Sequence, residues 1–413
     1  MSKLNDCCAC AGKLIGPDDR DPPFWPIYSR YFNFISHISP RFKIRNTLRT
    51  KQMLRSSVFR KHLKQIGIKQ HFGVPDSLLK DYNSYLSNEC KRDNLITANE
   101  GTAVAAAAGH YMATREPAMV FLQNSGLGNC MNPLLSLTHS DVYKIPICMM
   151  IGWRGESSDE PQHMVQGRCM LDQLDAINLP WSILPKYEEQ LPGYFKSIGE
   201  QHAIIVRKGT FEKYRPLTEQ NRIDQHKLST ESVFEEIVKH SNEHKFVAST
   251  GFNGRLLLNA RQNVEDNTAD FLTVGSMGHA STIAASISRK TEQPIVCVDG
   301  DGSVAMHMGN LLTNVQARPR KMLHIVLNNG KHASVGNQDT GMENTNLTAL
   351  ALTLGYHSAT QVNRLEDIKK HLMEIKIGLH MIVLDVNAPD PDIDLPRPIR
   401  TPEQTKIEFM KNL

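Results

Sequence analysis

The chain has 413 residues, which is too long for one ordinary domain and sufficient for two domains that each bury a core. With 40% hydrophobic and 22% charged residues, its composition is that of a packed globular protein and excludes a fibrous or disordered one. A net charge of +4 is too small to indicate a nucleic-acid partner. No run of about 18 apolar residues could cross a bilayer, so no membrane partner is predicted.

Residues 1–52 differ from the rest of the chain and are predicted to be a poorly structured extension that the chemistry does not need. Cys7, Cys8 and Cys10 cluster there, but no second Cys or His pair follows at zinc-site spacing. A structural zinc is therefore the less favoured interpretation. The other five cysteines lie in apolar segments and are predicted to be buried, reduced thiols.

The N-terminus lacks the short apolar stretch of a secretory signal, which predicts an intracellular protein. Between Arg41 and Lys64 there is no acidic residue, as in a mitochondrial presequence. Such presequences begin at the terminus, whereas here Asp6 and Asp18 come first. A cytoplasmic location is favoured, and a mitochondrial one is the alternative.

From residue 53 onward, short apolar runs alternate with longer helix-like stretches, which predicts an α/β fold with mostly parallel sheets flanked by helices. The predicted strands are 95–98, 118–123, 146–151 and 202–207 in the first half, and 245–249, 271–274, 294–299, 322–327 and 380–386 in the second. Two tandem domains are expected, at 53–211 and 227–395, with a linker at 212–226 and a tail at 396–413.

The most informative motif follows the predicted strand 294–299. The residues 299–303 read Asp-Gly-Asp-Gly-Ser, and one helical pattern continues from there to residue 315. A glycine turn between a strand and a helix presents backbone N–H groups that can hold a diphosphate. The carboxylate of Asp301 would lie beside that negative charge, and a hard cation between the two would resolve the repulsion. The alternative is an ordinary Asp-Gly turn.

A second strand-like run, 322–327, ends in Asn328-Asn329-Gly330, about two dozen residues after Gly302. Together the two motifs resemble the signature of thiamine diphosphate enzymes. The resemblance implies a Mg²⁺ site formed by Asp301, the side chain of Asn329 and the main-chain carbonyl of Lys331. Because all of these ligand atoms are oxygens, the expected ion is magnesium. In this half of the chain the implied cofactor-binding residues are Gly300, Asp301, Gly302, Ser303 and Asn329.

Two further segments match the same family. Glu100, in the stretch Thr97–Thr102, corresponds to the acid that hydrogen-bonds the cofactor's pyrimidine ring and promotes its reactive tautomer; the alternative is an acid that only caps the following helix. Met277 corresponds to the apolar residue that supports the bent cofactor, and the carbonyl of Gly275 would hold the pyrimidine amine. An ordinary core methionine is the alternative.

Two candidates remain for proton transfer. Asp76 lies in a strand-to-helix turn where the family places an acid near the reaction centre, although Asp and Ser also favour helix starts. His332 follows Asn329 by three residues and should lie near the substrate, either to deliver a proton or to bind the acid's tail. A structural role is the alternative for each, and which of them supplies the proton stays open.

Six stretches together resemble phosphonopyruvate decarboxylases, with sulfopyruvate decarboxylases as near relatives: FGVPDSLL, ANEGTA, NSGLGN, GSMGHAS, VDGDGS and LNNGKHASVGNQ. The resemblance implies decarboxylation of 3-phosphonopyruvate to phosphonoacetaldehyde and carbon dioxide, dependent on thiamine diphosphate and magnesium. It also implies a homodimer or larger homo-oligomer with shared active sites. The chain departs from the family at Lys331, where a small residue is usual, and in its N-terminal extension.

Other assignments are less favoured. Pyruvate decarboxylase relatives carry an extra domain where only a linker fits here, and transketolases usually carry the diphosphate-binding domain first, whereas Glu100 precedes Gly300 in this chain. A non-catalytic subunit would be expected to lose Glu100 or Asp301. A sulfonate is a near-isostere of a phosphonate, so sulfopyruvate stays an alternative substrate. Candidates to bind the anionic tail are Arg154, His163, Arg168, Lys331, His332 and Ser334.

Overall fold

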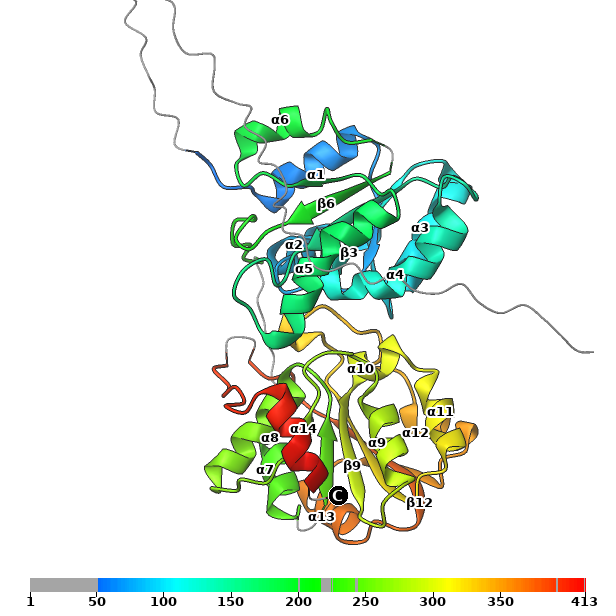
Figure 1. Ribbon diagram of the computed structural model, residues 1–413, viewed down its shortest axis with the longest axis vertical. Helices are drawn as coiled ribbons and strands as arrows, with labels where there is room; N and C mark the ends of the chain where they lie inside the picture. The colour runs from blue at the N-terminus through cyan, green and yellow to red at the C-terminus, as the bar shows by residue number, and fades with distance from the viewer. Residues whose placement is uncertain are drawn as a thin grey trace, which may run out of the picture. The chain divides into compact units, whose positions relative to one another are not determined.

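The computed structural model describes residues 51–199, 201–216, 224, 226–241, 244–390, 393–411 and 413 (Figure 1). The elements up to residue 206 form a first domain. Its strands are β1 (His71–Gly73), β2 (Asn94–Ile96), β3 (Ala118–Gln123), β4 (Ile147–Gly152), β5 (Trp181–Ile183) and β6 (His202–Val206). Its helices are α1 (Ser56–Gln65), α2 (Lys80–Glu89), α3 (Glu100–Thr114), α4 (Leu127–Pro133), α5 (Pro161–Ala176) and α6 (Leu191–Tyr194).

The first sheet is parallel throughout, in the order β2-β1-β3-β4-β6-β5. Strands β3, β4 and β6 are almost entirely buried because apolar side chains cover both of their faces. On one face they pack against α3, α4 and α5, and on the other against α1, α2 and α6. The domain is therefore a three-layer α/β structure.

The second domain has the same architecture. Its strands are β7 (Lys245–Ala248), β8 (Phe271–Leu272), β9 (Ile295–Gly300), β10 (Lys321–Asn328), β11 (Ser358–Val362) and β12 (Gly378–Asp385). Its helices are α7 (Thr230–Lys239), α8 (Phe252–Asn263), α9 (Ala280–Ser288), α10 (Asp301–Met306), α11 (Asn310–Ala317), α12 (Leu347–Leu354), α13 (Leu365–Met373) and α14 (Pro402–Lys411).

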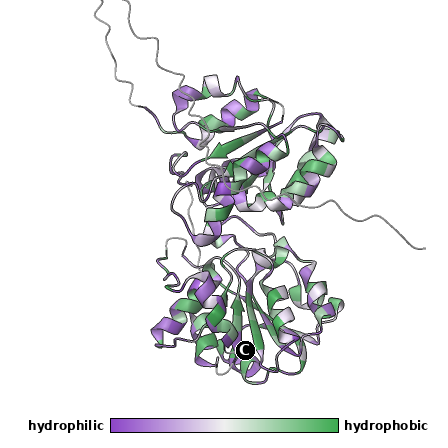
Figure 2. Ribbon diagram, viewed as in Figure 1, coloured by the Kyte–Doolittle hydropathy of each residue, from purple (hydrophilic) through white to green (hydrophobic). Residues whose placement is uncertain are grey.

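The second sheet is also parallel, in the order β11-β12-β10-β9-β7-β8. Helices α7, α8 and α13 cover one face, and α9, α11, α12 and α14 cover the other. Figure 2 shows the hydrophobic residues concentrated on the strands, as expected for a sheet with two covered faces. Read from its β8 edge, this sheet has the same order of strands, 2-1-3-4-6-5 within the domain, as the first sheet. The predicted fold class is confirmed.

Some sequence predictions about single elements were wrong or incomplete. The helix expected to run unbroken from the glycine turn to residue 315 is two helices, α10 and α11, separated at His307–Gly309. His307 leaves the helical region and its ring stacks on that of His279 with centroids 4.4 Å apart, and Gly309 favours a helix poorly. Strands β1, β5 and β11 were not predicted because each is short or poorly apolar.

Several predictions concern the ends of the chain and the linker. The extension, including its three cysteines, lies outside the described residues except for 51–52, and so does most of the linker. The other five cysteines are free, as predicted, but only Cys130, Cys148 and Cys297 are buried, whereas Cys90 and Cys169 are partly exposed. Within the part that the structure describes, no helix is both long and apolar enough to span a bilayer. The C-terminal segment contains α14, whose Phe409 is buried against Phe271 in the second core.

Candidate active site

The second domain contains a pocket at the carboxyl ends of β9 and β10. Parallel strands end at the same edge of a sheet, and ligand sites of open α/β folds lie at that edge. Seven of the residues predicted for cofactor or metal binding line this pocket, and so does His332. The seven are Met277, Gly300, Asp301, Gly302, Ser303, Asn329 and Lys331. Gly275 is not among the lining residues.

Asp301 is the first residue of α10, and its side chain is only 2% exposed. Its carboxylate accepts a hydrogen bond from the hydroxyl of Thr340 and is also stabilised by the backbone N–H of Asn329. Burial nevertheless raises the pKa of Asp301 to about 6. Among the described residues no lysine or arginine forms an ion pair with it, so its negative charge is stabilised by neutral groups alone.

The loop after β10 is folded back tightly on itself. The side-chain oxygen of Asn329 accepts the backbone N–H of Lys331 at 2.8 Å, and Gly330 adopts a φ of 69° that favours glycine. The ammonium group of Lys331 pairs with exposed Asp339, and Lys331 also lines the pocket. His332 is buried next to Gly302: a Cβ on that glycine would lie 3.1 Å from the imidazole. Burial lowers the pKa of His332 to about 4.

The segment that contains Met277 is held against the glycine turn. The backbone N–H of Gly278 donates to the hydroxyl oxygen of Ser303 at 3.0 Å, and Asn310 donates to the Gly278 carbonyl at 2.8 Å. Because the Ser303 oxygen acts as an acceptor here, its own hydroxyl proton is free to point elsewhere. The hydrogen bond between Gly278 and Ser303 thus fixes the position of the Gly275–Gly278 segment relative to the glycine turn.

In the first domain, Glu100 is the first residue of α3 and is 5% exposed. The helix cap is the preceding Asn99, whose side chain accepts the N–H of Thr102. Glu100 instead accepts a 2.7 Å hydrogen bond from Asn129, and burial raises its pKa. Asn99 thus supplies the side-chain cap of α3, and Glu100 lies in the first turn, where its charge would also favour the helix dipole.

Asp76 follows β1 and is fully buried. Its carboxylate accepts the backbone N–H of Leu78 at 3.0 Å, while its other oxygen has no hydrogen-bond partner among the described residues. The side chain packs directly over Gly152, at the end of β4. Arg154, two residues further on, donates to Ser77 in the same turn and to both oxygens of Asp159. Since β1 and β2 are neighbours, Asp76 and Glu100 follow adjacent strand ends.

Comparison with known proteins agrees with this geometry. The family described as thiamine pyrophosphate enzyme, N-terminal TPP binding domain, matches residues 55–176, and its C-terminal TPP binding domain matches residues 256–386. A phosphonopyruvate decarboxylase of Streptomyces hygroscopicus is 31% identical over 327 residues, 73% of this chain and 80% of the relative. The chain belongs to the thiamine pyrophosphate-dependent 2-oxo acid decarboxylases.

Two more relatives are similar over most of their length. The phosphonopyruvate decarboxylase of Streptomyces viridochromogenes is 29% identical over 339 residues, 74% of this chain and 81% of the relative. The sulfopyruvate decarboxylase of Methanosarcina acetivorans is 24% identical over 384 residues, 85% of this chain and 95% of the relative. This decarboxylase thus shares both domains with relatives whose names give different substrates.

The structure adds residues that the sequence did not single out. Asn129 donates to Glu100 and Thr340 donates to Asp301, while Gly126 leaves room for Glu100 and Gly152 leaves room for Asp76. Asn129 and Gly126 lie in the stretch NSGLGN, which was quoted without any role for its members. Thr340 lies in a loop without a recognisable pattern, so the sequence carried no signal for it.

The close packing of Gly126 on Glu100 leads to a first prediction. A Cβ on Gly126 would lie 2.1 Å from the Glu100 carboxylate, so Gly126→Ala must displace the acid, although the backbone (φ −77°) tolerates alanine. Displacement of a catalytic group by about 1 Å can cost about a hundredfold, and we expect a loss of turnover of that order. Gly128→Ala is the matched control, because no atom of the described residues lies within 4 Å of its Cβ position. Equal carbon dioxide release by both variants would contradict the assignment of Glu100.

A second prediction concerns the effect of pH on stability. Burial, opposed by the Arg154 guanidinium, raises the pKa of Asp76 to about 6, above its unfolded value of about 3.9. A raised carboxyl pKa destabilises the fold once the group ionises, so the contribution of Asp76 to stability is lost as pH rises from about 4 to 6. Asp76→Asn should match wild type below pH 4 and exceed it by on the order of 3 kcal/mol above pH 7 in urea unfolding. Asp172→Asn, on the exposed face of α5, serves as control. If the unfolding free energies of Asp76→Asn and wild type differed by the same amount at all pH values, the prediction would be contradicted.

Proposed function

We propose that this chain decarboxylates 3-phosphonopyruvate to phosphonoacetaldehyde and carbon dioxide, with thiamine diphosphate and Mg²⁺ as cofactors. The observation that carries the proposal is the pocket at the ends of β9 and β10, where the glycine turn and the Asn329 loop meet around a buried acid. The similarity to two phosphonopyruvate decarboxylases supports the choice of substrate.

The residues at the pocket fit a magnesium diphosphate. A buried carboxylate without a cationic side chain is costly, and a divalent cation would compensate it. We assign the cation to Asp301, the Asn329 side chain and the Lys331 carbonyl, all oxygen donors. Glycines at 300 and 302 carry no side chain that would keep a diphosphate away from the turn, and the free hydroxyl proton of Ser303 can add a donor.

Bound thiamine diphosphate supplies a carbon nucleophile and takes up the electron pair that carbon dioxide leaves behind. The protein's part is placement and proton transfer. We assign Glu100 to a hydrogen bond with the pyrimidine ring, where its buried carboxyl group can hold a proton because burial raises its pKa. Met277 would pack against the bent cofactor, and the Gly275 carbonyl would accept from its amine.

The proton that completes the aldehyde is assigned to Asp76 or His332. Asp76 has the stronger electrostatic basis, because its pKa of about 6 allows it to release and regain a proton near neutral pH. His332 is neutral at that pH and is suited to donate or accept a hydrogen bond rather than to bind an anion by charge.

The anionic tail of the substrate needs donors that are not already neutralised. Arg154 is an unfavourable candidate because its guanidinium already donates hydrogen bonds: Nη1 to Ser77, and Nη2 and Nε to Asp159. Burial lowers the pKa of His163, which disfavours its charged form. Ser334 lines the pocket and remains a candidate hydrogen-bond donor for the tail.

The proposed assembly is a homodimer or larger homo-oligomer, because in this family the two domains that hold one cofactor come from different subunits. Light scattering of the purified chain checks this, and a monomer with full activity would contradict it.

Carbon dioxide release with phosphonopyruvate, sulfopyruvate and pyruvate at equal concentration tests the substrate. We expect the largest specificity constant for phosphonopyruvate. Sulfopyruvate decarboxylation is the second candidate, because the relative with that name matches 85% of this chain. A higher constant for sulfopyruvate would transfer the assignment, and preference for pyruvate would refute an anionic tail site altogether. A complete lack of activity would favour a non-catalytic subunit.

A further inference from the structure

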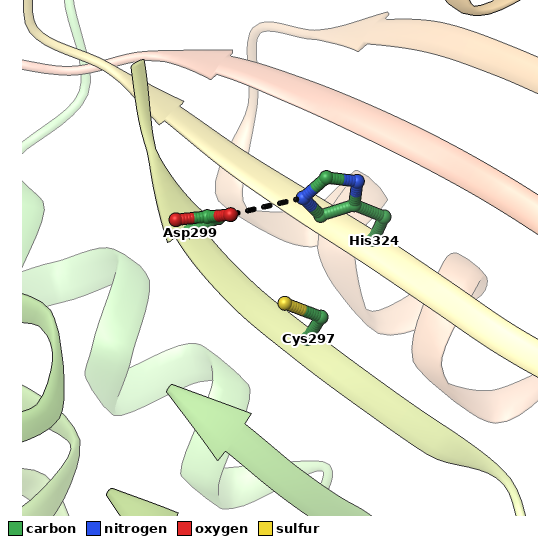
Figure 3. A group of neighbouring side chains, drawn as sticks. All are labelled: Cys297, Asp299 and His324. Carbon is green, nitrogen blue, oxygen red and sulfur yellow. Dashed lines mark ion pairs between the residues drawn. The ribbon is translucent and has the colours of Figure 1, made fainter. Parts of the chain in front are cut away.

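Three side chains with metal-binding chemistry lie together inside the second domain, apart from the residues assigned to magnesium. Cys297 and Asp299 come from β9 and His324 comes from β10 (Figure 3). All three are buried, with exposed fractions of 0%, 1% and 0%. Their candidate ligand atoms lie within 4.8 Å of one another.

Strand geometry explains the cluster. Residues two apart on a strand point to the same face, which places Cys297 and Asp299 together. In the parallel register His324 lies directly opposite Cys297 on the neighbouring strand, so the imidazole joins them on that face. The core behind this face is apolar and includes Val247 and Val326.

The imidazole of His324 is oriented by a partner on its far side. Its Nδ1 lies 3.3 Å from the hydroxyl of Tyr356, which leaves Nε2 directed at the cluster. Nε2 has no hydrogen-bond partner among the described residues and lies 3.5 Å from the nearer Asp299 oxygen. A buried polar nitrogen without a hydrogen bond is costly, and an outer hydrogen bond to the opposite nitrogen is the usual arrangement of a metal-binding histidine.

We propose that Cys297, Asp299 and His324 form a binding site for a borderline transition-metal ion such as Zn²⁺. Thiolate, carboxylate and neutral imidazole are all ligand types that Zn²⁺ accepts, and water can take a fourth position. The two negative ligands balance the +2 charge of the ion, so the complex is neutral overall. Coordination replaces the proton on the Cys297 sulfur, which is released to solvent as the bond forms.

The geometry requires only a small contraction. A centre among three atoms no more than 4.8 Å apart lies about 2.8 Å or less from each, compared with about 2.0–2.3 Å in zinc sites. Because the site is fully buried, the ion would enter while the domain folds. The proposal stands independently of the decarboxylase activity, since none of the three residues lines the cofactor pocket.

The test uses cobalt as a spectroscopic substitute for zinc. The full chain is produced in minimal medium supplemented with Co²⁺, so that the ion is present during folding, and near-ultraviolet absorption and metal content are measured after purification. A thiolate ligand gives a charge-transfer band, whereas a cobalt ion held only by oxygen at Asp301 gives none. We expect the band and about one retained equivalent of metal in this site.

The variants Cys297→Ala and Cys297→Ser should lose the band and that equivalent, while Cys148→Ala, which removes an equally buried thiol in the first domain, should keep both. The serine variant provides the result if the alanine variant does not fold. A folded wild-type protein without the band, or a band that persists in the Cys297 variants, would overturn the proposal and leave a simple Asp299–His324 contact.

Discussion

Asp301→Ala is expected to lower the affinity for thiamine diphosphate at fixed Mg²⁺ by at least about a hundredfold, because it removes the only proposed ligand that carries a negative charge. The fold should persist, since the carboxylate is buried without a cationic partner among the described residues and its loss removes a costly charge. Calorimetric titration measures the affinity, and circular dichroism checks the fold.

Asp339→Ala is the control for this experiment, since Asp339 is an exposed acid in the same loop and pairs only with the ammonium group of Lys331 among the described residues. It should bind the cofactor like wild type. Unchanged affinity in Asp301→Ala would remove the metal assignment, and an equal loss in both variants would point to a general effect of loop charge.

Glu100→Gln is expected to reduce turnover by at least about a hundredfold while cofactor affinity changes much less. The amide keeps the size of the side chain and its position over Gly126, but it cannot hold the proton that the pyrimidine ring requires. Steady-state carbon dioxide release at saturating cofactor separates this effect from weak binding.

Glu116→Gln is the matched control, because Glu116 follows the C-terminal end of the same helix α3 and its side chain pairs, among the described residues, only with the exposed Lys69. It should keep wild-type turnover. Wild-type turnover in Glu100→Gln would reduce Glu100 to a structural partner of Asn129.

The fold was predictable where burial dominates the sequence. Strands β3, β4, β6, β9 and β10 are runs of apolar residues covered on both faces, and their predicted positions agree with the structure within one or two residues. By contrast, β11 is largely exposed and contains Ser358 and Gln361, so hydrophobicity gave no signal. The break between α10 and α11 depends on His279, a residue distant in sequence, and no local pattern contains that contact.

The pocket residues could be predicted from the spacing of the glycine turn and the Asn329 loop, which both line it. Such spacing is expected where a diphosphate and a cation constrain the backbone. The neighbours that set the charge of the buried acids were not predictable. Thr340 reaches Asp301 from 39 residues away and Asn129 reaches Glu100 from 29, and these distances are decided by how the loops pack.

The shared order of strands in the two sheets has an evolutionary consequence. Two copies of one topology in a single chain are what duplication of an ancestral domain produces, so equivalent turns can be compared. The turn after the second strand holds Glu100 in one copy and Gly275–Gly278 in the other. The turn after the third strand holds Gly126 in one and Asp301 in the other. Under the proposed function, the first copy would supply Glu100 to the pyrimidine ring and the second copy would supply Asp301 to the magnesium diphosphate.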